Sequence, residues 1–359
     1  MENNYVIIMA GGIGSRYWPV SRSSRPKQFI DILGTGKSLI RHTYERFARK
    51  YKPENIWVVT NEQYRGLVKE QIPEIADMQI LGEPSGKNTA PCIAYATYRI
   101  MQNDPKATCM VVPSDHLIMD ETLFLECMEI AREFATEEEA FVTLGIKPTR
   151  PDTGYGYIQY LEEEKSPNVH KVKTFTEKPD LELAKTFLTS GDFVWNGGIF
   201  VFRASTMKSA FEKYLPDLHN LFKQGKNIYN TSDEAAFITK IYPQCPSVSI
   251  DYGIMEKANN VYTIPASFGW SDLGTWNSIY DTMDKDASGN AVVGKKVKLF
   301  ECNGNVLNMP HDKLVIMKGV DNLIVVEKDN ILLICDKDLE QEIKQVVTDI
   351  KLEFGEKYA

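Results

Sequence analysis

Short apolar runs alternate with longer amphipathic stretches through the first half of the chain. The runs are Tyr5–Met9, Asn55–Thr60, Met78–Leu81, Thr108–Val112 and Ala140–Leu144, and helical patterns lie between them at about 38–50, 61–71, 89–103 and 121–136. Strands that alternate with helices predict βαβ units, hence an α/β fold with a mostly parallel, mixed sheet. Ligands of such sheets bind beyond the carboxyl ends of the strands. Residues that directly follow these runs are therefore the first candidates for function.

The middle third continues the same domain with a less regular pattern. Strands are predicted at 156–160, 170–177 and 198–202, a helix at about 180–189, and further helices up to about 240. We interpret this part as an extension of the first half.

The last 75 or so residues have a different pattern. Between Asn290 and Cys335, apolar runs recur about every 7–10 residues with Gly, Asn and Asp between them. This pattern predicts a small all-β unit, either a few coils of a short β-helix or a barrel, and a helix at about 337–354 closes it. The polar segment 284–290 is the expected boundary, which gives a catalytic domain 1–284 and a C-terminal domain 285–359.

Composition narrows the classes of partner. The chain has 359 residues, 43% hydrophobic and 25% charged, with a formal net charge of −8. This fits a soluble protein with one large and one smaller domain, and it disfavours nucleic-acid binding, which usually needs a concentrated basic face. Anionic small substrates stay open, because a few local cations can dominate one cleft.

Cysteines and the N-terminus exclude two further classes. The six cysteines and five histidines are scattered, with no Cys-x-x-Cys or His-Glu-x-x-His pattern, so a structural zinc site is not expected. The start of the sequence lacks the features of a signal peptide, and no stretch approaches the roughly 18 apolar residues of a membrane span. The sequence therefore predicts a cytoplasmic protein without membrane contact.

A glycine-rich turn follows the first predicted strand. Gly11, Gly12 and Gly14 let the backbone turn tightly and bring N–H groups close to an anion. Ser15 adds a hydroxyl, and Arg16 adds a planar fork of donors that matches phosphate oxygens. Alone, such a turn is as often structural as functional.

Two familiar phosphate motifs do not fit this segment. The dinucleotide pattern G-x-G-x-x-G would need glycine at Tyr17, which argues against an NAD-dependent oxidoreductase. The P-loop pattern that ends at 36–38 would need glycine at Asp31. Arg16, with Lys27 eleven residues later, nevertheless favours phosphate binding.

The segment AGGIGSRYWPVSRSSRPKQF resembles the sugar-1-phosphate nucleotidylyltransferases, and within them the mannose-1-phosphate guanylyltransferase branch. Further segments are similar to that family in the same order: Glu83–Pro91, Val111–His116, Gly154–Ile158, Phe175–Pro179, Trp195–Phe200, Ser249–Gly253 and Gly269–Gly274. The resemblance spans residues 5 to about 280. Ser15 stands where the family more often has Thr, and Gly197 where Ser is expected; the second departure weakens inferences about the sugar side.

The resemblance implies a Rossmann-like nucleotidyltransferase fold that joins GTP to mannose 1-phosphate, giving GDP-mannose and pyrophosphate with the help of Mg²⁺. A sugar 1-phosphate is largely ionised at neutral pH, because its second pKa is about 6, so it needs no general base. The enzyme must position the reactants and neutralise charge. This agrees with the lack of any recognisable Ser-His-Asp or Cys-His arrangement.

On the nucleotide side, the resemblance assigns Asp115 and Asp272 to the metal, and Arg16 and Lys27 to the triphosphate. The glycine-rich turn, including Ser15, would also bind the nucleotide. The polar residues of the second motif, namely Glu83, Asn88 and Thr89, would face the base and ribose. A cap of the helix at 89–103 is the alternative interpretation of Asn88 and Thr89.

On the sugar side, Glu177 would accept sugar hydroxyls and Lys178 would meet the sugar phosphate, although an exposed charge pair is the alternative. Asn196 would bind a hydroxyl, and Gly154 would let the backbone approach the ring. Asp251 would assist either the metal or the sugar. Arg16, Lys27, Asp115 and Lys178 are thus the expected catalytic residues.

Several alternatives stay open. Another nucleotide or another sugar phosphate, such as a heptose 1-phosphate, fits the same motifs. A catalytically silent regulatory paralogue would be expected to lose the metal carboxylates or the basic residues, which are all present here. Homodimerisation through the C-terminal β unit is a hypothesis, since a small β unit has edges to protect.

Overall fold

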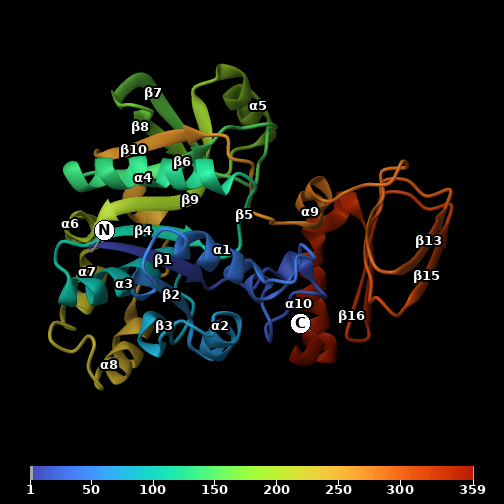
Figure 1. Cartoon of the computed structure of the whole chain (residues 1–359), viewed down its shortest axis with the longest axis horizontal. Coiled ribbons are helices and arrows are strands. Elements are labelled where there is room, and N and C mark those ends of the chain that lie inside the picture. The colour runs from blue at the N-terminus through green and yellow to red at the C-terminus, as the bar shows by residue number, and fades with distance from the viewer. Residues whose placement is uncertain (1–2, 359) are drawn as a thin grey trace. The chain divides into compact units, whose positions relative to one another are not determined.

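The computed structural model describes residues 3–358, which form two compact units (Figure 1). The first unit comprises residues up to Gly11, Thr43–Ser114 and Ile118–Trp270. The second comprises Gly12–His42, Asp115–Leu117 and the chain from Ser271 onward. The sequence predicted a single domain boundary at 284/285. In the structure, the segment Gly12–His42, which follows the first strand, belongs to the same compact unit as the C-terminal part.

A nine-stranded mixed sheet forms the centre of the first unit, in the order β3-β2-β1-β4-β9-β6-β10-β8-β7. Its strands are β1 Asn4–Ala10, β2 Ile56–Asn61, β3 Ile80–Glu83, β4 Thr108–Pro113, β6 Phe141–Ile146, β7 Tyr157–Ser166, β8 Val169–Thr176, β9 Phe193–Arg203 and β10 Val261–Ala266. The first four strands are parallel, as are β6 and β10, while β9 runs antiparallel between β4 and β6. The prediction of an α/β fold with a mixed sheet is confirmed.

Helices cover both faces of this sheet. They are α2 Arg65–Gln71, α3 Thr89–Asn103, α4 Glu121–Glu137, α5 Leu181–Ser190, α6 Ala204–Tyr214, α7 Pro216–Lys223 and α8 Glu234–Ile241, and α1 Leu39–Ala48 precedes them. In Figure 1, α4 lies against β4, β9 and β6, and α3, α6 and α7 pack together on the other face. Alternation along the strands explains the core: Ile7, Val59 and Val111 enter the cluster with α3 and α6, while their neighbours point to the α4 face.

The C-terminal part of the second unit is a short β-solenoid. Its strands are β12 Ala291–Val293, β13 Lys296–Phe300, β14 Val306–Asn308, β15 Leu314–Lys318, β16 Leu323–Lys328 and β17 Ile331–Asp336. Parallel pairing stacks β12, β14 and β16 in one sheet and β13 and β15 in another, and β17 closes the first sheet antiparallel to β16. The sequence left a solenoid and a barrel open, and the structure shows the solenoid.

Buried asparagines connect successive coils of this solenoid. Asn305, which is fully buried, donates its side-chain amide to Oδ1 of Asn290 at 2.9 Å and accepts the Leu323 amide at 2.9 Å. Helices α9 Trp276–Thr282 and α10 Ile343–Phe354 precede and follow the coils. The closing helix is therefore present, although residues 337–342 form a tighter 3₁₀ turn before it.

Two further strands are very short: β5 Leu117–Ile118 and β11 Trp270–Ser271. No helix within residues 3–358 is long and apolar enough to span a bilayer.

Candidate functional site

Glu83 ends strand β3 in the first unit and is only 6% exposed. Its Oε1 accepts a hydrogen bond from the Tyr242 hydroxyl, and its Oε2 lies 3.5 Å from the point where a Cβ would stand on Gly11. Burial raises the pKa of Glu83 to about 7, against the opposing effect of the Tyr242 hydrogen bond. A buried carboxyl group thus faces the exposed first glycine of the turn.

Five residues separate the start of helix α3 from the end of β3, and the side chains of Asn88 and Thr89 accept backbone hydrogen bonds at its N-terminus. Asn88, with φ 69°, caps the helix by accepting the Thr89 amide on its side-chain oxygen at 2.9 Å. The Thr89 hydroxyl accepts the amide of Ile250 at 2.8 Å. The capping interpretation of Asn88 is thus confirmed, and Thr89 connects the α3 N-terminus to the segment that carries Asp251.

Asn196 and Asp251, which the sequence predicted to bind the sugar, form a polar pair. The Asn196 amide donates to Asp251 Oδ1 at 2.6 Å, and its oxygen accepts the Gly198 amide at 3.1 Å. The register between β6 and β9 shifts here, and Gly198 has φ 65°, so the Asn-Gly-Gly sequence forms a bulge that orients Asn196. Burial, with a contribution from nearby Glu177, raises the pKa of Asp251.

Glu177 and Lys178 lie next to this pair. Their side chains form an ion pair at 2.8 Å, with Lys178 mostly exposed and in the left-handed backbone region at φ 45°. A Cβ on Gly156 would stand 2.6 Å from Glu177 Oε2, so the second glycine of the Gly-Tyr-Gly motif lets this carboxylate approach the backbone without moving aside. The predicted Gly154 is exposed, and its amide donates to Asp152 at 2.8 Å.

Aromatic rings surround the same region. Tyr155 packs edge-on against Trp195 at 5.0 Å and Trp270 at 5.2 Å, and the Arg150 guanidinium lies 5.4 Å from the Trp195 ring centre. Trp195 is buried, whereas Trp270 is partly exposed.

The glycine-rich turn continues into the second unit. Gly14 has φ 72°, and a Cβ there would stand 2.7 Å from Cβ of Lys27, so glycine is required on both grounds. Ser15 begins a short 3₁₀ turn, and Arg16 is exposed within it. Within residues 3–358, no hydrogen bond or ion pair engages the Arg16 side chain, which leaves its donors available to a ligand.

Lys27 is buried, at 4% exposure, and it lies between the two predicted metal ligands. Its ammonium pairs with Asp115 Oδ2 at 2.8 Å and donates to the main-chain oxygens of Asp272 at 2.8 Å and Leu273 at 3.0 Å. Three acceptors match the three N–H groups of an ammonium. The structure thus brings Asp115 and the Asp272 segment together around one lysine.

Both aspartates suit a magnesium ion by their chemistry. Burial alone would raise the pKa of Asp115, but Lys27 and His116 together hold it below its ordinary value, so this carboxylate is ionised at neutral pH. Asp272 accepts the Gly274 amide on Oδ1 at 3.0 Å. The described residues hold no cluster of three or more His, Cys, Asp or Glu side chains. Two carboxylates with substrate phosphates are a common magnesium environment.

The segment after the glycine-rich turn is anchored to the C-terminal part of its unit. Tyr17 and Trp18 pack in one cluster with Trp276, and the Tyr17 hydroxyl donates to the Thr275 carbonyl at 2.6 Å. The Trp18 indole donates to the main-chain oxygen of Tyr358 at 2.6 Å. The C-terminal part therefore supports the loop that carries Arg16 and Lys27, a role that the sequence did not suggest.

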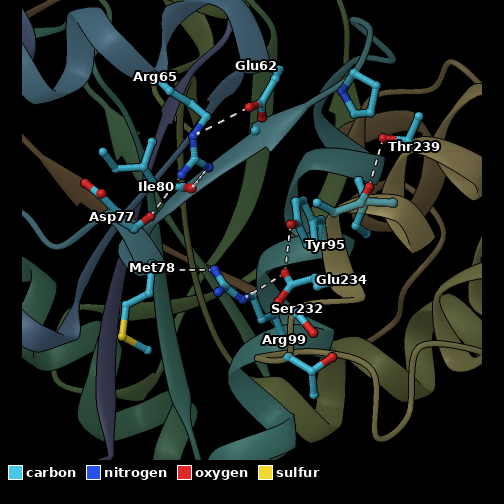
Figure 2. A pocket seen from close by; sticks show the side chains of 15 residues that line it. Glu62, Arg65, Asp77, Met78, Ile80, Tyr95, Arg99, Ser232, Glu234 and Thr239 are labelled. Atoms are coloured by element: carbon cyan, nitrogen blue, oxygen red, sulfur yellow. Dashed lines mark hydrogen bonds and ion pairs between the residues drawn. The ribbon is translucent and has the colours of Figure 1, made fainter.

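A cavity of about 520 Å³ opens elsewhere in the first unit and contains none of the predicted site residues (Figure 2). Arg99, which crosses its base, pairs with Glu234 at 2.9 Å, and Glu234 also accepts the Tyr95 hydroxyl at 2.8 Å. Arg65 donates to the Ile80 carbonyl at its edge. These pairings indicate a structural network, in which Arg99 Nε approaches Glu234 without a well-directed hydrogen bond.

Tyr242, Gly156 and Arg150 contact the predicted site residues or lie close to them, although the sequence did not single them out. Gly156 belongs to the Gly-Tyr-Gly motif, from which the sequence predicted Gly154. Only the position of Glu177 in the structure shows that Gly156 is the glycine beside this carboxylate. Tyr242 lies 159 positions from Glu83 in the sequence, so only the tertiary fold brings them together.

The chain matches known proteins along almost its whole length. The sequence pattern of the nucleotidyl transferase family matches residues 5–289, and that of the MannoseP isomerase/GMP-like beta-helix domain matches residues 300–350. The xanthan biosynthesis protein XanB of Xanthomonas campestris pv. campestris is 38% identical over 98% of this chain and 74% of its own length. The mannose-1-phosphate guanylyltransferase RfbM of Salmonella typhimurium is 37% identical over 96% and 72%.

A solved structure shares both units. The Thermus thermophilus protein described as mannose-1-phosphate geranyltransferase superposes with a TM-score of 0.87 and 31% identity, over 97% of this chain and 99% of that one. The sequence resemblance, the fold and these matches agree, and the chain belongs to the nucleotidyl transferase family.

Proposed function

We propose that this enzyme transfers GMP from GTP to mannose 1-phosphate and releases pyrophosphate. The observation that carries the proposal is the arrangement around Lys27, which gathers Asp115 and the Asp272 segment beside the glycine-rich turn. Two carboxylates next to a turn with an exposed arginine suit nucleotidyl transfer. The choice of GTP and mannose 1-phosphate is supported by the relatives that carry the name mannose-1-phosphate guanylyltransferase.

In the proposed reaction, an oxygen of the sugar phosphate attacks the α-phosphorus of GTP. A new phosphorus–oxygen bond forms, and the bond from the α-phosphorus to the α,β-bridging oxygen breaks, so that pyrophosphate leaves with that oxygen. No side chain needs to take a proton, because the attacking phosphate is already ionised. The protein contributes alignment and positive charge.

The nucleotide roles are those implied by the family resemblance, and the positions described above support them. Arg16 and the amides of Gly12, Gly14 and Ser15 bind the triphosphate. Lys27 adds positive charge, and it positions the two aspartate-bearing segments through its three contacts. Asp115 and Asp272 hold Mg²⁺, which when bound neutralises charge on the phosphates.

Base and ribose are assigned to the first unit. Glu83, beside Gly11, accepts N–H donors of the base, and the α3 N-terminus at Asn88 and Thr89 lies next to the ribose. For the sugar, Glu177, Asn196 and Asp251 accept or donate to hydroxyls, Gly154 allows backbone approach, and exposed Lys178 meets the sugar phosphate.

Product analysis tests this proposal. Phosphorus NMR of a reaction with GTP, mannose 1-phosphate and Mg²⁺ is expected to show GDP-mannose and pyrophosphate. Asp115→Asn and Asp272→Asn should each lower kcat/KM by about 10²–10³-fold, the scale for loss of one electrostatic group at a transition state. Asp349→Asn, on an exposed face of α10, is the matched control and should retain activity. Full activity of both site variants would refute the metal assignment.

Dimerisation through the C-terminal β unit and a cytoplasmic location remain predictions from the sequence. Light scattering at micromolar concentration would test the first, and a strict monomer would refute it.

A further inference from the structure

The Glu83 carboxylate is buried without a cation. It is 6% exposed, and no lysine, arginine or histidine among residues 3–358 pairs with it. Within residues 3–358, its single hydrogen-bond partner is the hydroxyl of Tyr242. A buried carboxylate with one donor is costly, so its other oxygen is suited to donors that a ligand brings.

Tyr242 is fixed more firmly than Glu83. The ring is fully buried in the core cluster beneath α3 and packs edge-on against Phe222 at 6.2 Å between ring centres. Its hydroxyl therefore occupies a defined point and sets the rotation of the Glu83 carboxylate. That rotation leaves Oε2 directed at Gly11, where the absence of a side chain keeps the approach open.

We propose that Tyr242 is a positioning residue for base selection, which holds Glu83 so that its carboxylate accepts the N1–H and exocyclic N2–H donors of guanine. This inference rests on the proposed function, in which Glu83 meets the base. Guanine presents two neighbouring N–H donors, and an ionised carboxylate offers only acceptors. Adenine presents one donor beside an acceptor, and uracil or thymine one donor between two carbonyls, so each places an acceptor against the carboxylate.

The charge state of Glu83 depends on the same contact. Burial raises its pKa to about 7, and the hydrogen bond from Tyr242 acts in the opposite direction. The other titratable group facing it is the Cys92 thiol of α3; burial raises the pKa values of both Cys92 and Tyr242, so both stay neutral near pH 7. Without Tyr242, Glu83 keeps its proton to higher pH, and the protonated oxygen would oppose a guanine donor.

The test compares GTP with inosine triphosphate, which lacks the N2 amino group. Initial rates of pyrophosphate release, with mannose 1-phosphate and Mg²⁺, are measured from pH 6 to 9 for the wild type, Tyr242→Phe and Tyr229→Phe. Tyr229 is the matched control, because its buried hydroxyl donates to the Phe222 carbonyl, away from Glu83.

Tyr242→Phe is expected to raise KM for GTP about tenfold with kcat within about twofold, since a hydrogen bond to a charged group is lost. Its preference for GTP over inosine triphosphate should fall by a similar factor, and the acid limb of kcat/KM should move to higher pH. Tyr229→Phe should retain the wild-type preference and profile. A Tyr242→Phe enzyme that keeps the wild-type preference for GTP and the wild-type pH profile would overturn the inference.

Two further measurements distinguish a wrong role for Tyr242 from a wrong assignment of Glu83. A wild type that does not prefer GTP to inosine triphosphate would overturn the assignment of Glu83 to guanine, and with it this inference. In a Glu83→Gln background, Tyr242→Phe should cause no further loss of preference, because both changes act on one contact. A full additional loss there would show that Tyr242 acts elsewhere and would overturn the proposal.

Discussion

The buried Glu83 carboxyl makes the stability of the protein depend on pH in a calculable way. Its pKa rises from an ordinary 4.5 to about 7 in the folded chain, mainly because burial disfavours the charged form. The folded state therefore holds this proton while the unfolded state has already lost it. Between these two pKa values, the group lowers the free energy of unfolding as pH rises, and the full cost is present above pH 7.

Glu83→Gln removes this titration and keeps an oxygen that can accept from Tyr242. A rise of the pKa from 4.5 to about 7, at about 1.4 kcal/mol per pKa unit, gives a limit of roughly 3 to 4 kcal/mol, most of which develops between pH 5 and pH 8. With an unfolding entropy of about 2.1 cal/mol/K per residue, this corresponds to a difference of about 3 °C in Tm for a chain of this length.

The assay is thermal unfolding of both proteins without ligand at pH 5, 6, 7 and 8. The Tm of Glu83→Gln minus that of the wild type should increase by about 3 °C across this range, whatever its value at pH 5. The Tyr229→Phe variant, which changes no carboxyl group, should show a constant difference. A Glu83→Gln difference that stays constant or decreases with pH would refute the reasoning.

Three other variants test individual contacts by urea unfolding. Gly14→Ala should lose about 2 kcal/mol, because it places a side chain at φ 72° and against Lys27, whereas Gly12→Ala, with no atom within 4 Å, should change stability by less than about 0.5 kcal/mol. Equal losses would contradict the conclusion that glycine is needed at Gly14 and not at Gly12. Glu234→Ala should lose about 3–5 kcal/mol, because it leaves Arg99 buried without its partner, and it should not alter the preference for GTP over inosine triphosphate. A loss below about 1 kcal/mol would argue against a structural network in that cavity.

Much of the fold could be predicted because its signals are local. The apolar run at 108–112 and the helical pattern at 89–103 agree closely with β4 and α3, which are buried along most of their length. The strand β10 at Val261–Ala266 was not predicted, since its sequence contains Pro265, which disfavours a strand inside a sheet. Its neighbours β6 and β8 supply the context that the sequence alone lacks.

The site could be predicted by residue type but not by environment. Lys27 was identified from its motif as a ligand for phosphate, yet its burial between Asp115 and two main-chain carbonyls depends on segments more than 80 positions away. Similarly, Glu83 was found from its motif, while the Tyr242 hydroxyl that orients it belongs to a distant segment of α-helical and 3₁₀ structure. The burial and the long-range partners of Lys27 and Glu83 determine their charge state and orientation, and neither can be predicted from local residue spacing.

Selectivity and metal dependence are measured together by pyrophosphate release from mannose 1-phosphate and Mg²⁺ with GTP, ATP, UTP, CTP and dTTP in parallel, for the wild type and Asp115→Ala. We expect release with GTP well above that with the other four nucleotides, and its loss in the variant. Equal or greater release with another nucleotide would contradict the guanine assignment, and release that persists in Asp115→Ala would contradict the metal site.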